Sequence, residues 1–277
     1  MPSDMTDDSF HRTRDPERFV YHYTSRDVGL THILAERQLK VAPFSSTNDP
    51  RESKDWEFDL YWKGGRKLPK IKSHAEWKRT ATELAKGTAK LLCMSSDDQV
   101  AVMNDPLDTF ARGFARPRMW AQYAENHQGI CLVFDREVLH QAITDQLGTR
   151  ATIYNGLVSY SNEESVREGA FSLDYNQIAE VGLKSVLSDH IRRFHRLLFF
   201  TKAEDWSTEF EYRWLVYSSS PGLEEFVDFG DALVAVVVGS SFHKVYYASL
   251  KPLCAKHRAK FGRLDWRNGH PALIPHN

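Results

Sequence analysis

The chain of 277 residues has no long run of apolar residues. Its longest aliphatic segment covers residues 232–238, whereas a helix needs about 20 apolar residues to cross the hydrocarbon core of a bilayer. Residues 1–16 are polar and acidic, and they lack the apolar centre of a secretory signal. We therefore expect a soluble, cytoplasmic protein.

An excess of charge is also missing. Lys plus Arg number 36 and Asp plus Glu number 37, so the net charge is −1, which predicts no overall attraction to nucleic acid. The cysteines Cys93, Cys131 and Cys254 are far apart, and the 12 histidines form no His-x-x-x-His pair or Cys/His cluster. We predict no metal site, and we expect Cys93 and Cys131 to be buried thiols.

Two well-known motifs are absent. The chain has no glycine-rich phosphate loop, which disfavours a Rossmann-type dinucleotide fold. It has no Gly-x-Ser-x-Gly segment either, which weakens an α/β-hydrolase interpretation. Hydrophobic residues make up 42% and charged residues 26%, as is ordinary for a globular protein.

Hydrophobic periodicity predicts one α+β domain with a mixed, mostly antiparallel sheet flanked by helices. Residues 1–17 are expected to form a flexible arm, and residues 18–277 the domain, with a helical insertion around 73–128 and 162–200. Strands are expected at 19–24, 39–44, 91–95, 130–134, 151–161, 206–217, 225–229, 233–238 and 263–267. Helices are expected after Ser25 and at 73–86, 117–126, 136–147, 162–169, 175–199 and 242–260. The segment 97–114 is predicted to be a loop, and Gly129 a left-handed helix cap.

The most informative segment is Trp206–Tyr217, which alternates as a strand does. Glu209, Glu211 and Arg213 fall on one face, and the carboxylates of a Glu-x-Glu strand lie roughly 6–7 Å apart. One carboxylate can hold a substrate hydroxyl while the other stabilises positive charge or accepts a proton. The alternative is a solvated ladder of charges, which contributes little.

Three polar clusters lie on or beside predicted strands. They are His22-Tyr23-Thr24, Ser45-Ser46-Thr47 and Glu209-x-Glu211. The first cluster could equally hold a hydrogen-bonded core or surface histidine. The second could be a plain turn or a helix cap.

This ordered set resembles the three core strands of the ADP-ribosyltransferase superfamily, whose first two strands are joined by one helix. Over roughly residues 19–240 the chain is more closely similar to the bacterial family catalogued as "domain of unknown function 2971". The residues that carry this similarity are Tyr21–Thr24, Ser46–Pro50, Leu92–Ser95, Met119–Ala124, His127–Cys131, Thr201–Lys202, Trp206 and Glu209–Arg213.

The superfamily resemblance implies a split, ADP-ribosyltransferase-like sheet and an enzyme that cleaves the nicotinamide–ribose bond of NAD. ADP-ribose would pass to a protein, a nucleic acid or water, and a toxin or phage-defence effector is one expected role. An inhibitory partner is left open. Glu211 would bind the ribose 2′-hydroxyl and stabilise the oxocarbenium ion, Glu209 would position the acceptor, and His22 would bind the ribose or the nicotinamide amide.

The remaining residues assigned to NAD binding by the resemblance are Tyr23, Thr24, Ser45, Ser46, Thr47, Trp206 and Arg213. Among them, Trp206 or Tyr23 would stack on nicotinamide, and Arg213 would neutralise the carboxylates or contact a phosphate. A working glutamate would titrate in the activity profile near pH 4–6.

Two other functions stay open. The fold could serve as a non-catalytic nucleotide- or protein-binding module, with Trp120, Tyr123 and Trp206 as anchors. A weaker option is a metal-dependent hydrolase or nuclease.

Overall fold

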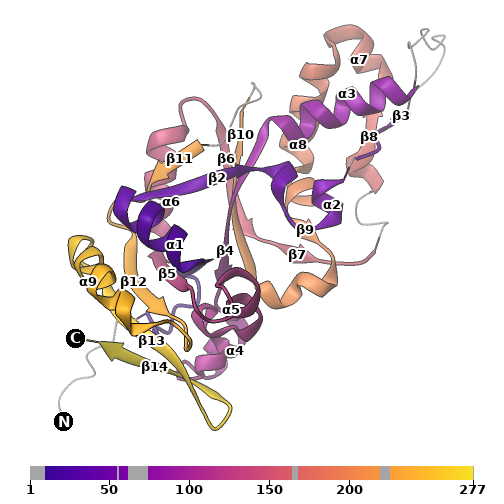
Figure 1. Cartoon of the computed structure of the whole chain (residues 1–277). Coiled ribbons are helices and arrows are strands. Elements are labelled where there is room, and N and C mark those ends of the chain that lie inside the picture. Colours follow the sequence, from indigo (N-terminus) through magenta and orange to yellow (C-terminus); the bar gives the residue numbers. More distant parts are fainter. Residues whose placement is uncertain (1–9, 55, 62–73, 164–167, 219–224, 277) are drawn as a thin grey trace, which may run out of the picture.

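The computed structural model describes residues 10–54, 56–61, 74–163, 168–218 and 225–276 (Figure 1). Within these ranges the main sheet has ten strands, in the order β11-β2-β4-β1-β5-β12-β13-β14, with β10 joined to β4 and β6 joined to β10. These strands are β1 (Phe19–Thr24), β2 (Gln38–Pro43), β4 (Ala89–Ser96), β5 (Ile130–Asp135), β6 (Thr152–Leu157), β10 (Glu211–Tyr217), β11 (Glu225–Asp228), β12 (Leu233–Val238), β13 (Lys260–Arg267) and β14 (His270–His276). Among the pairs of this sheet β12–β13 is parallel and the others are antiparallel, which confirms the mixed, mostly antiparallel α+β architecture.

Helices cover the sheet and extend beyond it. The α-helices are α1 (Arg26–Val28), α2 (Pro50–Ser53), α3 (His74–Gly87), α4 (Gln99–Asn104), α5 (Pro117–Tyr123), α6 (Arg136–Leu147), α7 (Tyr175–Val181), α8 (Leu183–Phe199) and α9 (Tyr247–Lys256). One π-helix, η1 (Gly29–Leu34), and short 3-10 helices complete the set: η2 (Phe44–Ser46), η3 (Thr109–Ala111), η4 (Gly113–Ala115), η5 (Glu168–Phe171), η6 (Glu204–Glu209) and η7 (Lys244–Tyr246). None of the helices in the described ranges is long and apolar enough to span a membrane.

The apolar segment Ile130–Phe134 shows why the sheet is covered on both faces. Successive side chains of a strand point to opposite faces, and here Ile130, Leu132 and Phe134 join one core while Cys131 and Val133 join another. Residues of α6 and α9 pack in the first core, and residues of α5 pack in the second. A strand buried on both faces reads as continuously apolar.

A third core joins α3 and α8 to the main sheet, because it also contains Ala89 and Leu91 of β4 and Leu215 of β10. There α3 packs against α8, and β3 (Asp59–Tyr61) pairs with β8 (Ser172–Asp174). In Figure 1 these elements form an outgrowth at the upper right. Of the two ranges expected to form a helical insertion, 73–128 contains α3 but also β4 of the main sheet, and 162–200 contains α7 and α8. A second small pair joins β7 (Ser159–Tyr160) to β9 (Thr201–Lys202).

The sheet has a gap along one edge of β4. The far edge of β4 pairs with β10 over its whole length. On the near edge, β1 pairs with β4 only at Ser95 and Ser96, and β2 pairs with it only at Lys90 and Leu91. Residues 92–94 therefore have no strand partner in β1 or β2, and the sheet is split there.

The direction of the backbone groups follows from the register. Ser96 N–H donates to the Phe210 carbonyl at 2.8 Å, so it points away from the gap. Because these directions alternate along a strand, the N–H and C=O of Cys93 point into the gap. The split thus leaves the N–H and C=O of Cys93 without a backbone partner in β1 or β2.

Several predicted elements differ from the structure. The strand expected over 206–217 begins only at Glu211, because residues 204–209 form η6 and Phe210 is left-handed, with φ of 48°. The hydroxyl of Ser95 donates to the Glu209 carbonyl at 2.6 Å, which holds this turn against the end of β4. The helix expected over 175–199 is broken at Gly182, whose φ of 83° ends α7.

Other differences concern loops and ends. The segment 97–114 contains α4 and two 3-10 turns, and β14 rather than β13 forms the sheet edge. Phe10 and Thr13, within the expected arm, are buried, whereas residues 1–9 lie outside the described ranges. The helix expected over 162–169 falls partly on residues 164–167, which also lie outside them.

The turn after α5 differs from the expected left-handed cap at Gly129. Left-handed backbone occurs instead at Glu125, Asn126 and His127, with φ of 49°, 51° and 68°. Gly129 is required for close packing, since an added Cβ would lie 2.3 Å from the Thr24 carbonyl oxygen.

The contact between this turn and Gly239 leads to a prediction about stability. An added Cβ at Gly239 would lie 2.1 Å from the carbonyl oxygen of His127, so Gly239→Ala must displace backbone. We expect the substitution to lower the free energy of unfolding by about 1–3 kcal/mol, as overpacking does. Urea denaturation measures this change. Gly87→Ala is the control, because nothing lies within 4 Å of its added Cβ; an equal loss in both variants would contradict the prediction.

Candidate functional site

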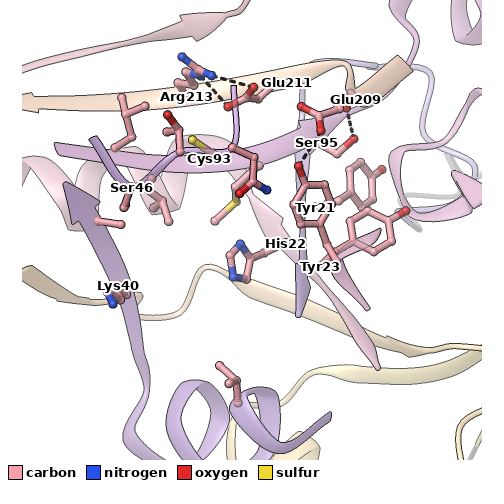
Figure 2. Close-up of a pocket in the computed structure, with 18 of the residues that line it drawn as sticks. Tyr21, His22, Tyr23, Lys40, Ser46, Cys93, Ser95, Glu209, Glu211 and Arg213 are labelled. Atoms are coloured by element: carbon pink, nitrogen blue, oxygen red, sulfur yellow. Dashed lines mark hydrogen bonds and ion pairs between the residues drawn. The ribbon is translucent and has the colours of Figure 1, made fainter. Parts of the chain in front are cut away.

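A pocket of about 650 Å³ opens at the split between β1 and β2. Residues of η1, β1 and β2 form its walls, and charged residues of α2, β9 and β10 lie at its inner end. The stretch of β4 that pairs with neither β1 nor β2 forms its back. Figure 2 shows Glu211 and Arg213 paired on one side, with His22 across from them and Cys93 between. The volume is within the usual range for small-molecule sites, about 300–1,000 Å³.

Most of the residues assigned to a site from the sequence converge on this pocket. Those that line it are His22, Tyr23, Ser46, Thr47, Glu209, Glu211 and Arg213. Thr24, Ser45 and Trp206 are not among the lining residues. Three segments that are far apart in the chain are therefore brought to one cavity.

Arg213 organises the inner end of the pocket. Its Nε and Nη2 donate to the Glu211 carboxylate at 2.5 and 3.0 Å, and its Nη1 donates to Glu52 Oε1 at 2.5 Å. A further bond of 2.7 Å reaches the Phe199 carbonyl. The guanidinium is 1% exposed, so its charge must be balanced by these carboxylates within the protein.

Lys202 joins the two glutamates of the Glu-x-Glu segment. Its Nζ donates to Glu209 at 2.7 Å and to Glu211 at 3.1 Å, so the two carboxylates lie side by side. The hydroxyl of Tyr123 donates to the other oxygen of Glu209 at 2.8 Å. The ring of Trp206 lies 4.4 Å from the Lys202 ammonium, and it covers this cation instead of lining the pocket.

The surrounding charges control the ionisation of Glu211. Burial raises its pKa, but the positive charges of Arg213 and Lys202 and the bonds from Arg213 and the Cys93 thiol outweigh burial and lower the pKa to about 2. Glu211 is therefore an anion at every pH above about 4. Burial raises the pKa of Cys93 well above its usual value, so this side chain remains a thiol.

His22 reaches across the gap. Its ring hydrogen-bonds to the backbone of Cys93, while burial lowers the pKa of the ring. The imidazole is therefore neutral at pH 7. It is both a hydrogen-bonded histidine, as one interpretation of the sequence held, and a pocket residue.

Other assigned side chains are already engaged. The hydroxyl of Tyr23 donates to the Gly113 carbonyl at 2.6 Å, and its ring packs edge-on against Trp120. Ser46 and Thr47 donate to the carbonyls of residues 43 and 44 at 2.7 and 3.1 Å. The turn predicted as the alternative for this segment is thus present, and it also lines the pocket.

Three residues that complete the cluster, Glu52, Cys93 and Lys202, were not assigned to a site from the sequence, and Tyr123 was named only as an anchor of the alternative binding module. Lys202 and Tyr123 belong to motifs that carry the family resemblance, which was the available signal. Cys93 was expected only as a buried thiol. Glu52 follows Asp49-Pro50 in a charged segment, and nothing in its local pattern distinguishes it. Within the described ranges, His, Cys, Asp and Glu side chains form no group of three placed to hold a metal ion.

Comparison with known proteins gives a limited result. Residues 119–214 match the family model described as "Protein of unknown function (DUF2971)", which supports the resemblance to that family over this segment. The matched segment contains Tyr123, Lys202, Glu209, Glu211 and Arg213. Neither a curated protein nor a solved structure matches the chain, so the resemblance to ADP-ribosyltransferases is not shown by these comparisons.

The ion cluster predicts how stability depends on pH. Glu211→Gln breaks one buried ion pair of Arg213 and one of Lys202, so the free energy of unfolding should fall by about 3–5 kcal/mol at neutral pH. A carboxyl pKa that is lowered on folding stabilises the protein above its unfolded value of 4.5, and this stabilisation is lost as the pH falls toward about 2. Urea denaturation should therefore show the difference between wild type and variant shrinking between pH 4.5 and 2.

Asp97→Asn is the matched control for this experiment. The Asp97–Arg112 pair is equally buried, with 2.8 Å between the charged groups, and neither residue lines the pocket. Burial raises the pKa of Asp97, so the stability lost in this variant should not shrink in the same way. A pH-independent difference for Glu211→Gln would contradict the assignment of a lowered pKa.

Proposed function

We propose that the pocket binds NAD and that the protein cleaves the nicotinamide–ribose bond, transferring ADP-ribose to a macromolecule or to water in the manner of an ADP-ribosyltransferase. The observation that carries the proposal is the convergence of His22, the segment Ser46–Thr47 and the Glu209/Glu211 pair on one cavity of about 650 Å³. These are the three clusters whose order in the chain resembles that superfamily.

The charge of Glu211 suits the reaction. When the C1′–N1 bond breaks, its electron pair leaves with nicotinamide, and positive charge develops on the ribose ring. A preorganised carboxylate stabilises such a charge best where water is excluded. Glu211 is 5% exposed and anionic at physiological pH, so it can act without first losing a proton.

Glu209 is placed to help the acceptor. The acceptor oxygen forms the new bond to C1′, and its proton must pass to a base. Glu209 lies beside Glu211 and shares Lys202 with it, which makes Glu209 the carboxylate available for that proton. The lowered pKa of Glu211 also changes the expected pH profile, since the acid limb near pH 4–6 cannot come from Glu211.

One observation favours the second candidate, a binding module without turnover. The carboxylates and cations of the cluster satisfy one another, and Glu209 and Arg213 are 3% and 1% exposed. Such a cluster could be structural, with the pocket used for binding alone. The two candidates differ in whether nicotinamide is released.

The test is nicotinamide release from NAD by the purified protein, with a variant that fills the pocket. Ser46 is exposed and lines the pocket, whereas its neighbour Ser45 is exposed but does not line it. We expect Ser46→Trp to reduce release by at least about tenfold, because the indole occupies the cavity, and Ser45→Trp to leave it unchanged. Equal activity in both variants would place the reaction elsewhere.

Two further arms complete the experiment. Glu211→Gln, assayed where it remains folded, should abolish release while Asp97→Asn retains it. Dependence of release on added cell lysate would indicate a transferase, and independence a glycohydrolase. Binding of NAD without release in any condition would favour the binding module, and no binding by calorimetry would contradict the NAD assignment.

A further inference from the structure

The two carboxylates that share Arg213 are unequally supplied with hydrogen bonds. Glu211 receives Nε and Nη2 of Arg213 and Nζ of Lys202, together with the thiol of Cys93. Glu52 receives Nη1 of Arg213 on Oε1 alone, and its Oε2 has no hydrogen-bond partner among the described residues. Glu52 is 2% exposed and lines the pocket, so Oε2 is a buried oxygen that lacks a donor.

The charges of the cluster are also unequal. Three carboxylates, those of Glu52, Glu209 and Glu211, surround two cations, Lys202 and Arg213. An uncompensated buried anion is costly, and a buried carboxyl group takes up a proton to avoid that cost. The proton is held most easily by the carboxyl with the fewest donors, which is Glu52.

We propose that Glu52 carries a proton and that its Oε2–H group donates a hydrogen bond to a carbonyl or amide oxygen of the molecule bound in the pocket. The protonated carboxyl still accepts from Arg213 through Oε1 and becomes a donor at Oε2. An oxygen that receives no hydrogen bond from the described residues is thereby turned into a group that recognises a ligand.

The groups around Glu52 act on its carboxyl in opposite directions, and the net result is a raised pKa. Burial is the largest influence and raises its pKa; Arg213 and Lys202 oppose it, and Glu211 adds to it. From α3, Lys86 Nζ contacts the backbone carbonyl of Glu52 at 2.7 Å. The neighbouring Asp49 caps α2 through its Oδ1 and adds a second carboxyl group on the same short helix.

The ligand class follows from the chemistry of a neutral carboxyl group at the charged end of the pocket. Such a group binds an uncharged acceptor, and a site built around a buried donor discriminates strongly against analogues that lack the matching group. If the pocket binds NAD as proposed above, the carboxamide oxygen of nicotinamide is the acceptor at hand. Free nicotinamide is therefore the probe.

Whether Glu52 carries a proton can be tested without any ligand. Gln has the shape of a protonated Glu and keeps a donor, so Glu52→Gln should shift the urea midpoint at pH 7 far less than Glu211→Gln does on the same arginine. A carboxyl group whose pKa is raised on folding stabilises the folded state at low pH, and this stabilisation is lost as the pH rises. The urea midpoint of wild type should therefore fall relative to that of Glu52→Gln as the pH increases. A midpoint shift as large as that of Glu211→Gln would overturn the proposal.

The hydrogen bond is tested by calorimetry with nicotinamide. Glu52→Gln should bind it within about threefold of wild type, whereas Glu52→Leu should bind at least about tenfold more weakly, since one buried hydrogen bond is lost. Equal affinity in Glu52→Leu would overturn the role in recognition. If wild type does not bind nicotinamide at all, nicotinamide is not the ligand that Glu52 recognises and the role in recognition is overturned. The denaturation experiment still decides where the proton lies, and release of nicotinamide from NAD decides the proposed function separately.

Discussion

The site depends on one buried cation. Arg213 lies on β10 with its guanidinium almost fully enclosed, and an isolated buried charge would be too costly to keep. Its donors therefore hold Glu211 from the same strand, Glu52 from α2 and the carbonyl of Phe199 at the end of α8. By satisfying one charge, the fold fixes three elements around the inner end of a pocket.

The pocket itself arises from a break in strand pairing. If β1 and β2 had met along β4, the stretch 92–94, which now pairs with β10 alone, would have had a strand on both edges. The gap instead directs the backbone N–H and C=O of Cys93 toward the cavity, and His22 hydrogen-bonds to this backbone from β1. A polar backbone edge and a buried ion cluster thus face one space, and this combination suits a ligand that carries both polar and charged groups.

The sequence predicts part of this arrangement well. The alternation of Glu211 and Arg213 with Tyr212 and Trp214 places the first pair toward the pocket and the second in the core, because a strand has a period of two. Glu209 reaches the same pocket from the end of η6, ahead of the left-handed Phe210, which no periodicity reveals. Glu52 could not be found from its neighbours, since its partner Arg213 is 161 residues away.

The central claim is that the split between β1 and β2 is where the ligand binds, with Glu211 at the reacting end. A crystal structure of the protein with an NAD analogue whose glycosidic bond cannot be cleaved tests this most directly. The account predicts the nicotinamide ribose at hydrogen-bond distance from Glu211 and the nicotinamide ring inside the pocket. An analogue bound on another surface, or an empty pocket at saturating concentration, would contradict it.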